Sequence, residues 1–159
     1  MPDMLVRLWK LDFTSARLKE KDLMEKENVK FVRPLSPNFK KVEAYVAEEF
    51  GSGWASEITA ALYNDPVSCF IALDREDEIL GFACYNATGK GFFGPTGVSE
   101  KARGKGIGSV LLWRCLEGLW DAGYAYGIIG AAGPVEYYAK TVGATLIEDS
   151  TPGIYYRSF

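Results

Sequence analysis

Apolar positions along the chain recur in short blocks, and their spacing separates strands from helices. The apolar runs "VSCFIALD" and "ILGFACYNA" are joined by the charged turn "REDE", which predicts a β-hairpin. The segments "NFKKVEAYVAEEF" and "WASEITAALYN" predict two helices separated by a break at Gly51 and Gly53, with Asn38 capping the first. A helical period predicts a further helix over residues 104–122, with apolar positions at Ile107, Val110, Leu111, Cys115 and Leu119.

From residue 29 onward the blocks follow the order β-α-α-β-β-β-α-β-α-β-β. Strands are expected at 29–35, 67–74, 79–87, 91–98 and 126–132, and a helix at 134–142 precedes a closing strand pair at 144–149 and 153–159. The strand at 91–98 contains Gly94, Pro95 and Gly97, which weaken a sheet ladder and predict a bulge. The order predicts an α/β (α+β) domain.

Residues 1–28 precede this order and are assigned to an N-terminal extension, which leaves 29–159 as the main domain. Residues 4–11, "MLVRLWKL", predict a strand, and the charge-dense run that follows is interpreted as a solvated helix face or a linker. A strand without a partner in the main domain is able to complete the sheet edge of a second copy. A homodimer is therefore one possible assembly.

The hexapeptide "RGKGIG", residues 103–108, places three glycines where the helix at 104–122 begins. Glycine inside a helix costs about 1 kcal/mol relative to alanine, so this spacing indicates that bare backbone is needed there. The first turn of a helix presents free N–H groups and the positive end of the macrodipole, and the neighbouring cations add charge. We interpret Arg103, Gly104, Lys105, Gly106, Ile107, Gly108 and Ser109 as a phosphate cradle. The spacing fits neither the dinucleotide fingerprint nor a P-loop.

Composition narrows the class of protein. The chain has 159 residues, which is enough for one core. Its composition, with 48% hydrophobic and 25% charged residues, is ordinary for a folded protein. A net charge of −3 argues against nucleic-acid binding, so Lys101 and Lys105 indicate a local ligand site. No apolar run is long enough to cross a membrane, no metal-ligand spacing occurs, and the three cysteines lack C-x-x-C spacing. We expect a cytoplasmic protein with free thiols and no bound metal.

The pattern R-x-x-G-x-G, preceded by a strand that ends in "GV" at 97–98, resembles the acetyl-CoA signature of the GCN5-related N-acetyltransferases. This resemblance implies a mixed, mostly antiparallel central sheet with flanking helices. It also implies acetyl-CoA as cofactor, with its pyrophosphate held by Arg103 through Ser109. Pantetheine would lie along the strand at 91–98, where Thr96, Gly97 and Val98 offer backbone groups. The implied reaction is direct acetyl transfer to a primary amine of a small molecule or protein.

The resemblance also implies a tyrosine that protonates the leaving thiolate. The family carries an aromatic-Tyr pair before Gly-Phe on its last helix, and this chain has Tyr137 and Tyr138 before Gly143-Ala144. Counting forward from the helix start selects Tyr138, whereas counting back from the glycine selects Ala139. We assign Tyr138 as the acid, with Tyr137 as its alternative. Ala131 and Ala132 stand where many members have an asparagine that binds pantetheine.

The general base and the acceptor stay open. The chain contains no histidine, so the base is a carboxylate, a tyrosine or water, and the carboxylates near the expected site are Glu48, Glu49, Glu57 and Glu100. Aromatic residues that are able to line an acceptor pocket are Phe50, Trp54, Tyr63 and Phe92. A non-catalytic acyl-CoA-binding module that regulates a partner is the alternative function.

Overall fold

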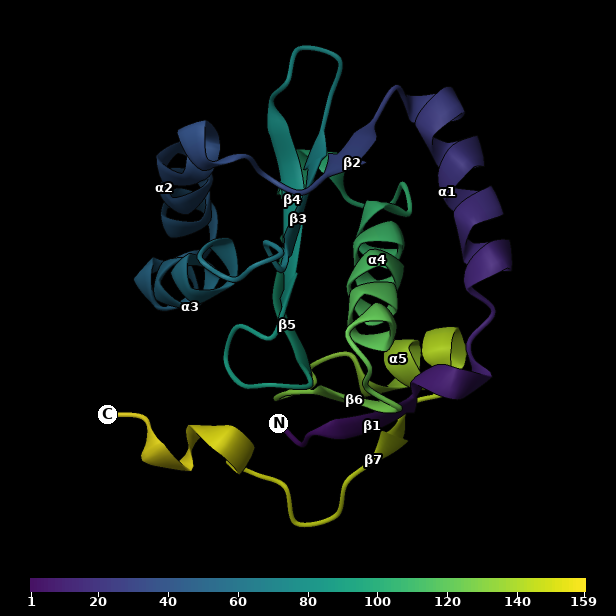
Figure 1. The fold of residues 1–159 in the computed structure, drawn as a ribbon, viewed down its shortest axis with the longest axis vertical. Coiled ribbons are helices and arrows are strands. Elements are labelled where there is room, and N and C mark those ends of the chain that lie inside the picture. Colours follow the sequence, from purple (N-terminus) through teal and green to yellow (C-terminus); the bar gives the residue numbers. More distant parts are fainter.

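The computed structural model describes residues 1–159, which form one seven-stranded sheet with helices on both faces (Figure 1). The strand order is β2-β3-β4-β5-β6-β1-β7. The strands are β1 (Met4–Arg7), β2 (Lys30–Val32), β3 (Cys69–Leu73), β4 (Ile79–Tyr85), β5 (Phe92–Val98), β6 (Tyr126–Ile129) and β7 (Thr145–Leu146). Every neighbouring pair is antiparallel except β5 with β6, which confirms the mixed, mostly antiparallel sheet.

The helices divide between the two faces of the sheet and bury a core on each. The α-helices are α1 (Phe13–Glu27), α2 (Phe39–Phe50), α3 (Ser52–Leu62), α4 (Ile107–Asp121) and α5 (Val135–Val142). The apolar sides of α2 and α3 pack on one face around Val46, Ile58 and Phe82. On the other face α4 forms the larger core with residues of α5, and Leu111 and Leu116 are fully buried. The helical period at 104–122 thus predicted a buried helix correctly, with its first turn at Ile107.

The two central strands, β5 and β6, separate after a short contact. They pair in parallel only at Phe92 with Ile128 and at Phe93 with Ile129. On the other side of β5, Thr96 lies opposite Ala83, but Phe93 lies opposite Tyr85, so β5 contains one extra residue within this stretch. This is the bulge that the glycines and Pro95 predicted. The bulge and the short parallel contact leave the edge of β5 open beyond Phe93.

The N-terminal strand does not lie at the edge of the sheet. β1 pairs with β6 on one side and with β7 on the other, so both of its edges are occupied within this chain. Helix α1 then packs on α4, where Phe13 contacts Trp113 edge to face and Glu20 pairs with Arg114. The expected boundary at residue 28 is therefore crossed by one continuous sheet, and on its outer side β1 pairs with β7 at Met4 and Leu5.

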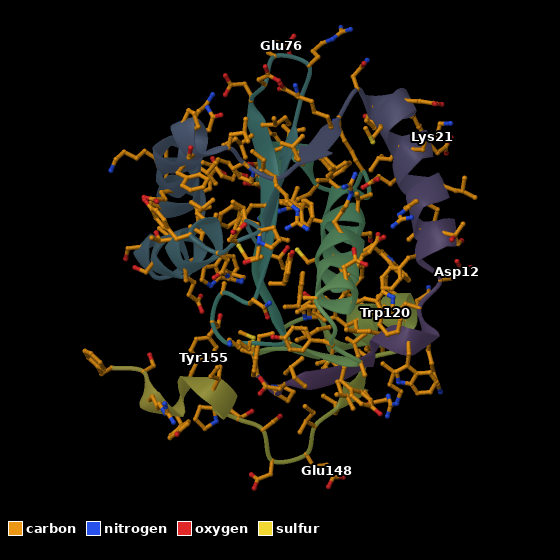
Figure 2. The ribbon with its side chains drawn as sticks, viewed as in Figure 1. Asp12, Lys21, Glu76, Trp120, Glu148 and Tyr155 are labelled. Atoms are coloured by element: carbon orange, nitrogen blue, oxygen red, sulfur yellow. The ribbon has the colours of Figure 1, made fainter.

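The closing strand pair predicted at 144–149 and 153–159 is wrong. Only β7 forms, over Thr145–Leu146, and Gly153–Arg157 is instead the 3₁₀ helix η4. After β7 the Ile147 N–H still donates to the Asp3 carbonyl, and the Asp3 N–H then donates to Ser150 Oγ at 2.8 Å instead of to a further strand residue. A second correction concerns Asn38, whose side chain makes no capping hydrogen bond. The C-terminal segment then runs back beneath α3 (Figures 1 and 2).

Two further features are absent from the structure. None of its helices is both long and apolar enough to span a bilayer. No three side chains of His, Cys, Asp or Glu lie close enough together to hold a metal ion.

Candidate active site

The glycine loop before α4 contains two residues with positive φ, a conformation that favours glycine. Gly104 has φ +80° and Gly106 has φ +92°, a region that costs other residues about 1–2 kcal/mol. A Cβ at Gly104 would meet no atom within 4 Å, and a Cβ at Gly106 would meet only Leu23 Cδ2 at 3.9 Å. Packing against the protein therefore does not explain these glycines. They allow the turn itself and leave the helix N-terminus open to an anion.

Arg103 connects this loop to the end of β5. Its side chain reaches back so that Nε donates to the Val98 carbonyl at 3.1 Å. Lys105, two residues further on, lies with its ammonium 3.8 Å from a carboxylate oxygen of Glu27 on α1. The structure thus brings together the expected cofactor residues of the loop and of β5, with both cations on the outside of the turn.

The free edge of β5 presents backbone donors. The Ser99 N–H donates to the Leu80 carbonyl of β4 at 2.8 Å. Because alternate residues of a strand point their N–H groups to opposite edges, Thr96 and Val98 point theirs away from β4, into the opening between β5 and β6. On the far side of the opening, the backbone that follows β6 is hydrogen-bonded to the N-terminal residues. The Ala131 N–H donates to Asp3 Oδ1, and the Ala132 N–H donates to the Pro2 carbonyl.

Gly97 has a different role from its neighbours on β5. A Cβ there would lie 2.6 Å from the ring of Phe50, so only glycine allows this ring to rest on the strand. Phe50 in turn packs on Trp54 and Phe82, with ring centroids 5.6 and 5.4 Å away. The close approach fixes the end of α2 and the start of α3 against β5.

The two tyrosines of α5 point to different places. Tyr138 is 7% exposed, and its ring lies 6.3 Å from that of Phe93 at the start of the opening. Burial, with a smaller contribution from Tyr137, raises the pKa of Tyr138 to about 12. Tyr137 is 38% exposed, and its hydroxyl lies 2.6 Å from Ser109 Oγ on the first turn of α4. Tyr138 thus faces the separated strands and Tyr137 faces the cradle.

A cavity of about 760 Å³ extends from the open edge of β5 to α3 and η4. Among the residues that line it are Trp54, Glu57, Phe92, Thr96, Tyr138 and Tyr155. Two aromatic residues expected at an acceptor pocket, Trp54 and Phe92, are therefore present. Phe50 supports Trp54 from below, whereas Tyr63 is 73% exposed and packs on Phe39 away from the cavity.

Glu57 is the only acidic side chain that lines this cavity. Its Oε1 atom accepts a hydrogen bond from Thr88 Oγ1 at 2.6 Å and another from Tyr155 Oη at 2.7 Å. Of the other carboxylates considered from the sequence, Glu48 and Glu49 lie exposed on α2, and Glu100 is exposed in the 3₁₀ helix η3 (Glu100–Ala102). Sequence reasoning missed Thr88 and Tyr155, because no local pattern relates either residue to Glu57.

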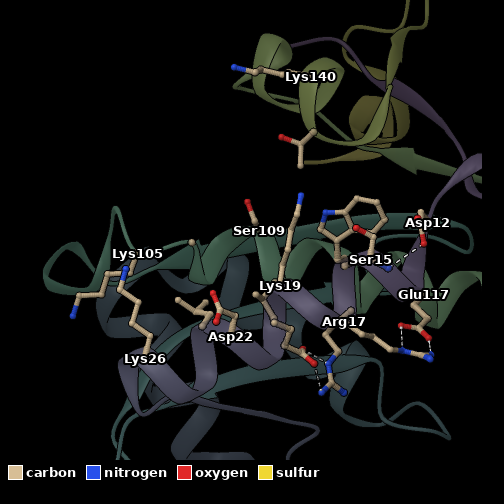
Figure 3. A pocket seen from close by; sticks show the side chains of 18 residues that line it. Asp12, Ser15, Arg17, Lys19, Asp22, Lys26, Lys105, Ser109, Glu117 and Lys140 are labelled. Atoms are coloured by element: carbon tan, nitrogen blue, oxygen red, sulfur yellow. Dashed lines mark hydrogen bonds and ion pairs between the residues drawn. The ribbon is translucent and has the colours of Figure 1, made fainter.

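A second hollow, of about 690 Å³, runs between α1 and α4 and begins at the cradle (Figure 3). Gly106 and Ser109 form one end of it, and Lys140 on α5 lies across the opening from Ser109. Arg17 pairs with Glu117 and Arg114 with Glu20, whereas Lys19, Lys26 and Lys140 form no ion pair. This groove extends the positive charge of the cradle along the side of α4.

The arrangement fits an elongated diphosphate ester. The diphosphate suits the start of α4, which has free N–H groups and glycines that leave the backbone accessible. Lysines that form no ion pair lie beside it. The opening between β5 and β6, with backbone donors on one edge, suits an extended chain that carries amide groups. The cradle, the open edge and the buried Tyr138 lie along one path through the sheet.

Comparison with known proteins agrees with this geometry. The family model described as "Acetyltransferase (GNAT) family" matches residues 38–143. This match covers more than half of the chain, so the protein belongs to the GNAT acetyltransferase family, whose cofactor is acetyl-CoA. No curated protein sequence matches the chain.

Solved structures share the fold at low sequence identity. A GCN5-related glucosamine N-acetyltransferase region of a fungal multi-domain GH3 β-N-acetylglucosaminidase has a TM-score of 0.73 at 16% identity, over 92% of this chain and 19% of that one. A GCN5-related N-acetyltransferase from Sphaerobacter thermophilus has a TM-score of 0.61 at 18% identity, over 76% and 42%. A GNAT acetyltransferase from Brucella melitensis, in complex with acetyl-CoA, has 0.56 at 16%, over 76% and 88%. The chain thus spans less than half the length of the first two.

Proposed function

We propose that the protein is an N-acetyltransferase that moves an acetyl group directly from acetyl-CoA to a primary amine of a small molecule or protein. One observation carries this proposal: Tyr138 and Glu57 line the same cavity as the open edge of β5. A donor for the leaving group, a charged group for an amine and backbone donors therefore share one cavity.

The cofactor-binding residues in this proposal come from two elements. Arg103, Gly104, Lys105, Gly106, Ile107, Gly108 and Ser109 would hold the pyrophosphate through the N-terminus of α4 and the neighbouring cations. Thr96, Gly97 and Val98 would lie along the pantetheine. A backbone N–H near the bulge would orient the acyl carbonyl, and Arg103 keeps the loop fixed to Val98.

Acetyl-CoA supplies an acetyl group activated as a thioester. In direct transfer the amine nitrogen forms a bond to the acetyl carbon while the carbon–sulfur bond breaks, and no oxidant or reductant takes part. Tyr138 Oη gives a proton to the departing sulfur, and the proton that the nitrogen releases replaces it through solvent. A tyrosine whose pKa lies at about 12 is fully protonated near neutral pH and is therefore ready to donate.

A thiol-release assay tests the function. The protein is incubated with acetyl-CoA and a panel of primary amines, free CoA is quantified with a thiol reagent, and the acetylated amine is identified by mass spectrometry. Amine-dependent release with a matching acetylated product is the expected result. Tight CoA binding with no product from any amine, or from a protein extract, would instead favour the non-catalytic acyl-CoA-binding module. The three buried, free cysteines are in keeping with a cytoplasmic site of action.

A further inference from the structure

The acceptor cavity is lined by a single charged side chain. Glu57 contributes the one carboxylate, and no lysine, arginine or aspartate side chain lines the walls. The Glu57 carboxylate is half-buried and forms no ion pair with the chain, so its charge favours a ligand that carries an ammonium group. An α-amino acid finds no lysine or arginine side chain for its carboxylate here. A polyamine lacks a second anion for its other ammonium groups.

Glu57 is held in place but retains binding capacity. Both hydrogen bonds that it accepts, from Thr88 and Tyr155, reach the same oxygen, Oε1. Oε2 accepts no hydrogen bond from the chain, although a carboxylate has about four acceptor positions in all. Burial and the hydrogen bond to Glu57 raise the pKa of Tyr155, so this hydroxyl stays a donor to the carboxylate. The orientation of Glu57 is thus fixed, and Oε2 is available to an ammonium group.

The walls around Glu57 are largely apolar and aromatic. Trp54 lies three residues before Glu57 on α3, so the indole and the carboxylate share one face of the helix. Phe50 and Phe82 support the indole, with ring centroids 5.6 and 6.1 Å from it. Phe92 and Ile154 line the same space. The indole of Trp54 and the ring of Phe92 offer no hydrogen-bond partner to the hydroxyl groups of an amino sugar that lies against them, whereas an apolar ring packs on both.

The C-terminal segment closes this side of the cavity. Ile154 and Tyr155 of η4 line it, and the Tyr155–Glu57 hydrogen bond ties η4 to α3. Asp3 anchors the other end of the segment, because its N–H donates to Ser150 Oγ and its carbonyl accepts from Ile147. Tyr155 therefore positions Glu57 and at the same time limits the length of a molecule that fits beside it.

From these observations we infer that the acceptor is a monoamine with an apolar, ring-sized body, whose ammonium binds Glu57 Oε2 beside Trp54 while Tyr155 positions the carboxylate. This inference rests on the proposed function, because it names the class of amine that the same site accepts. The body packs against Trp54 and Phe92, where an indole also stabilises a nearby cation. The bound ammonium gives one proton to solvent before it reacts, and the neutral amine nitrogen then attacks from the cavity that Tyr138 lines.

A panel of four amines tests the substrate class: 2-phenylethylamine, glucosamine, lysine and spermidine. We expect kcat/KM for 2-phenylethylamine to exceed the values for the other three by at least about tenfold, since they leave charges or hydroxyl groups unpaired. The same rank order should appear in NMR titrations of binding with the acetyl-CoA analogue desulfo-CoA present. Preference for glucosamine, lysine or spermidine would overturn the inference.

The role of Glu57 is tested with a charged ligand and its neutral isostere, benzylamine and benzyl alcohol. Glu57→Gln keeps an oxygen for Thr88 and Tyr155 but removes the charge, and should weaken benzylamine about 10- to 100-fold while leaving benzyl alcohol unchanged. Glu25→Gln, on the exposed side of α1, is the matched control and should change neither. Equal weakening of both ligands by Glu57→Gln would show a packing defect and overturn the assignment.

Tyr155→Phe keeps the ring and removes the hydrogen bond to Glu57. As a positioning residue it should raise KM for the amine severalfold, with kcat and the Kd of CoA nearly unchanged, whereas loss of the segment's fold would alter all three. An unchanged KM would overturn the role of Tyr155. Glu57-dependent binding of benzylamine with no acetyl transfer would support this selectivity and overturn the proposed function, so the two failures are distinguishable.

Discussion

Met4 lies directly opposite Ile129, and this antiparallel register places β1 inside the sheet rather than at its edge. Met4 is 1% exposed and Ile129 2%, so the pair is part of the larger core. Leu146 of β7 flanks Met4 on the other side. The open strand β6, which borders the acceptor cavity, therefore depends on the first residues of the chain for its outer neighbour.

Deletion of residues 1–28 should prevent folding. The deletion removes the buried side chains of Met4, Val6 and Leu8 and exposes an edge of β6. We expect the fragment 29–159 to aggregate, measured by gel filtration, and to lack a cooperative thermal transition in circular dichroism. A soluble, cooperatively folded fragment that binds CoA would instead show that 29–159 is an autonomous domain.

A pair of leucine substitutions gives the same test without truncation. Leu8→Ala, at a side chain 1% exposed, should lower the free energy of unfolding by about 2–5 kcal/mol. Leu18→Ala makes the same change on α1 at a side chain 66% exposed and should stay within about 0.5 kcal/mol of wild type. Urea denaturation measures both. Equal effects would argue against a core role for the N-terminal segment.

Gly106→Ala should weaken CoA binding by at least about tenfold, because the methyl group occupies the approach to the helix N-terminus. Gly123→Ala is a matched control: its φ is +99°, its Cβ would also lie in open space, and it lies beyond the other end of α4. Both variants should lose about 1–2 kcal/mol of stability from the positive φ. Calorimetry with CoA separates them, and identical affinities would count against the cradle.

Arg103→Ala should weaken CoA more than pantetheine, because only CoA carries the diphosphate. Arg103→Lys keeps the charge but loses the planar donor that bonds the Val98 carbonyl, so its CoA affinity should be intermediate. Isothermal titration with both ligands gives the two ratios. Equal losses for CoA and pantetheine in Arg103→Ala would mean that the residue only supports the loop.

Tyr138→Phe should lower kcat by about 10²-fold, near the low end for general-acid catalysis, since a CoA thiolate is a fair leaving group without help. The Kd of acetyl-CoA should change little, because the ring keeps its packing on Phe93. Tyr137→Phe loses only the hydrogen bond to Ser109 and should affect the KM of acetyl-CoA rather than kcat. Reversed phenotypes would make Tyr137 the acid, and full activity of both variants would exclude tyrosine.

The pH dependence of this effect follows from the burial of Tyr138. Desolvation raises its pKa to about 12, so the hydroxyl keeps its proton below that value, and its contribution is lost only as pH rises through about 12. The ratio of kcat for wild type to kcat for Tyr138→Phe should therefore stay constant between about pH 7 and pH 10. A ratio that falls towards one across this interval would show that the acid is a group with a lower pKa.

The sequence by itself determined the features that depend on local backbone preferences. The glycine spacing at 103–108 predicted the cradle because positive φ at Gly104 and Gly106 is a property of those residues alone. Gly94 and Pro95 predicted the bulge in β5 for the same reason, and the apolar period predicted α4. These features, with the strand and helix order, carry the resemblance to the GNAT acetyltransferases, and that resemblance implied the fold and the cofactor.

The tertiary structure decided how distant segments meet. Strand propensity at residues 4–11 and 153–159 does not tell which segment joins the sheet. In the structure β1 pairs with β6, whereas residues 153–157 form η4 outside the sheet. Tyr155 and Glu57, 98 positions apart, meet only in the folded chain, where Asp3 also bonds Ser150 of the segment that leads to Tyr155. The rotation of α5 about its axis places Tyr138, and not Tyr137, in the cavity. Packing against the rest of the protein sets this rotation, so the sequence of a short helix does not determine it.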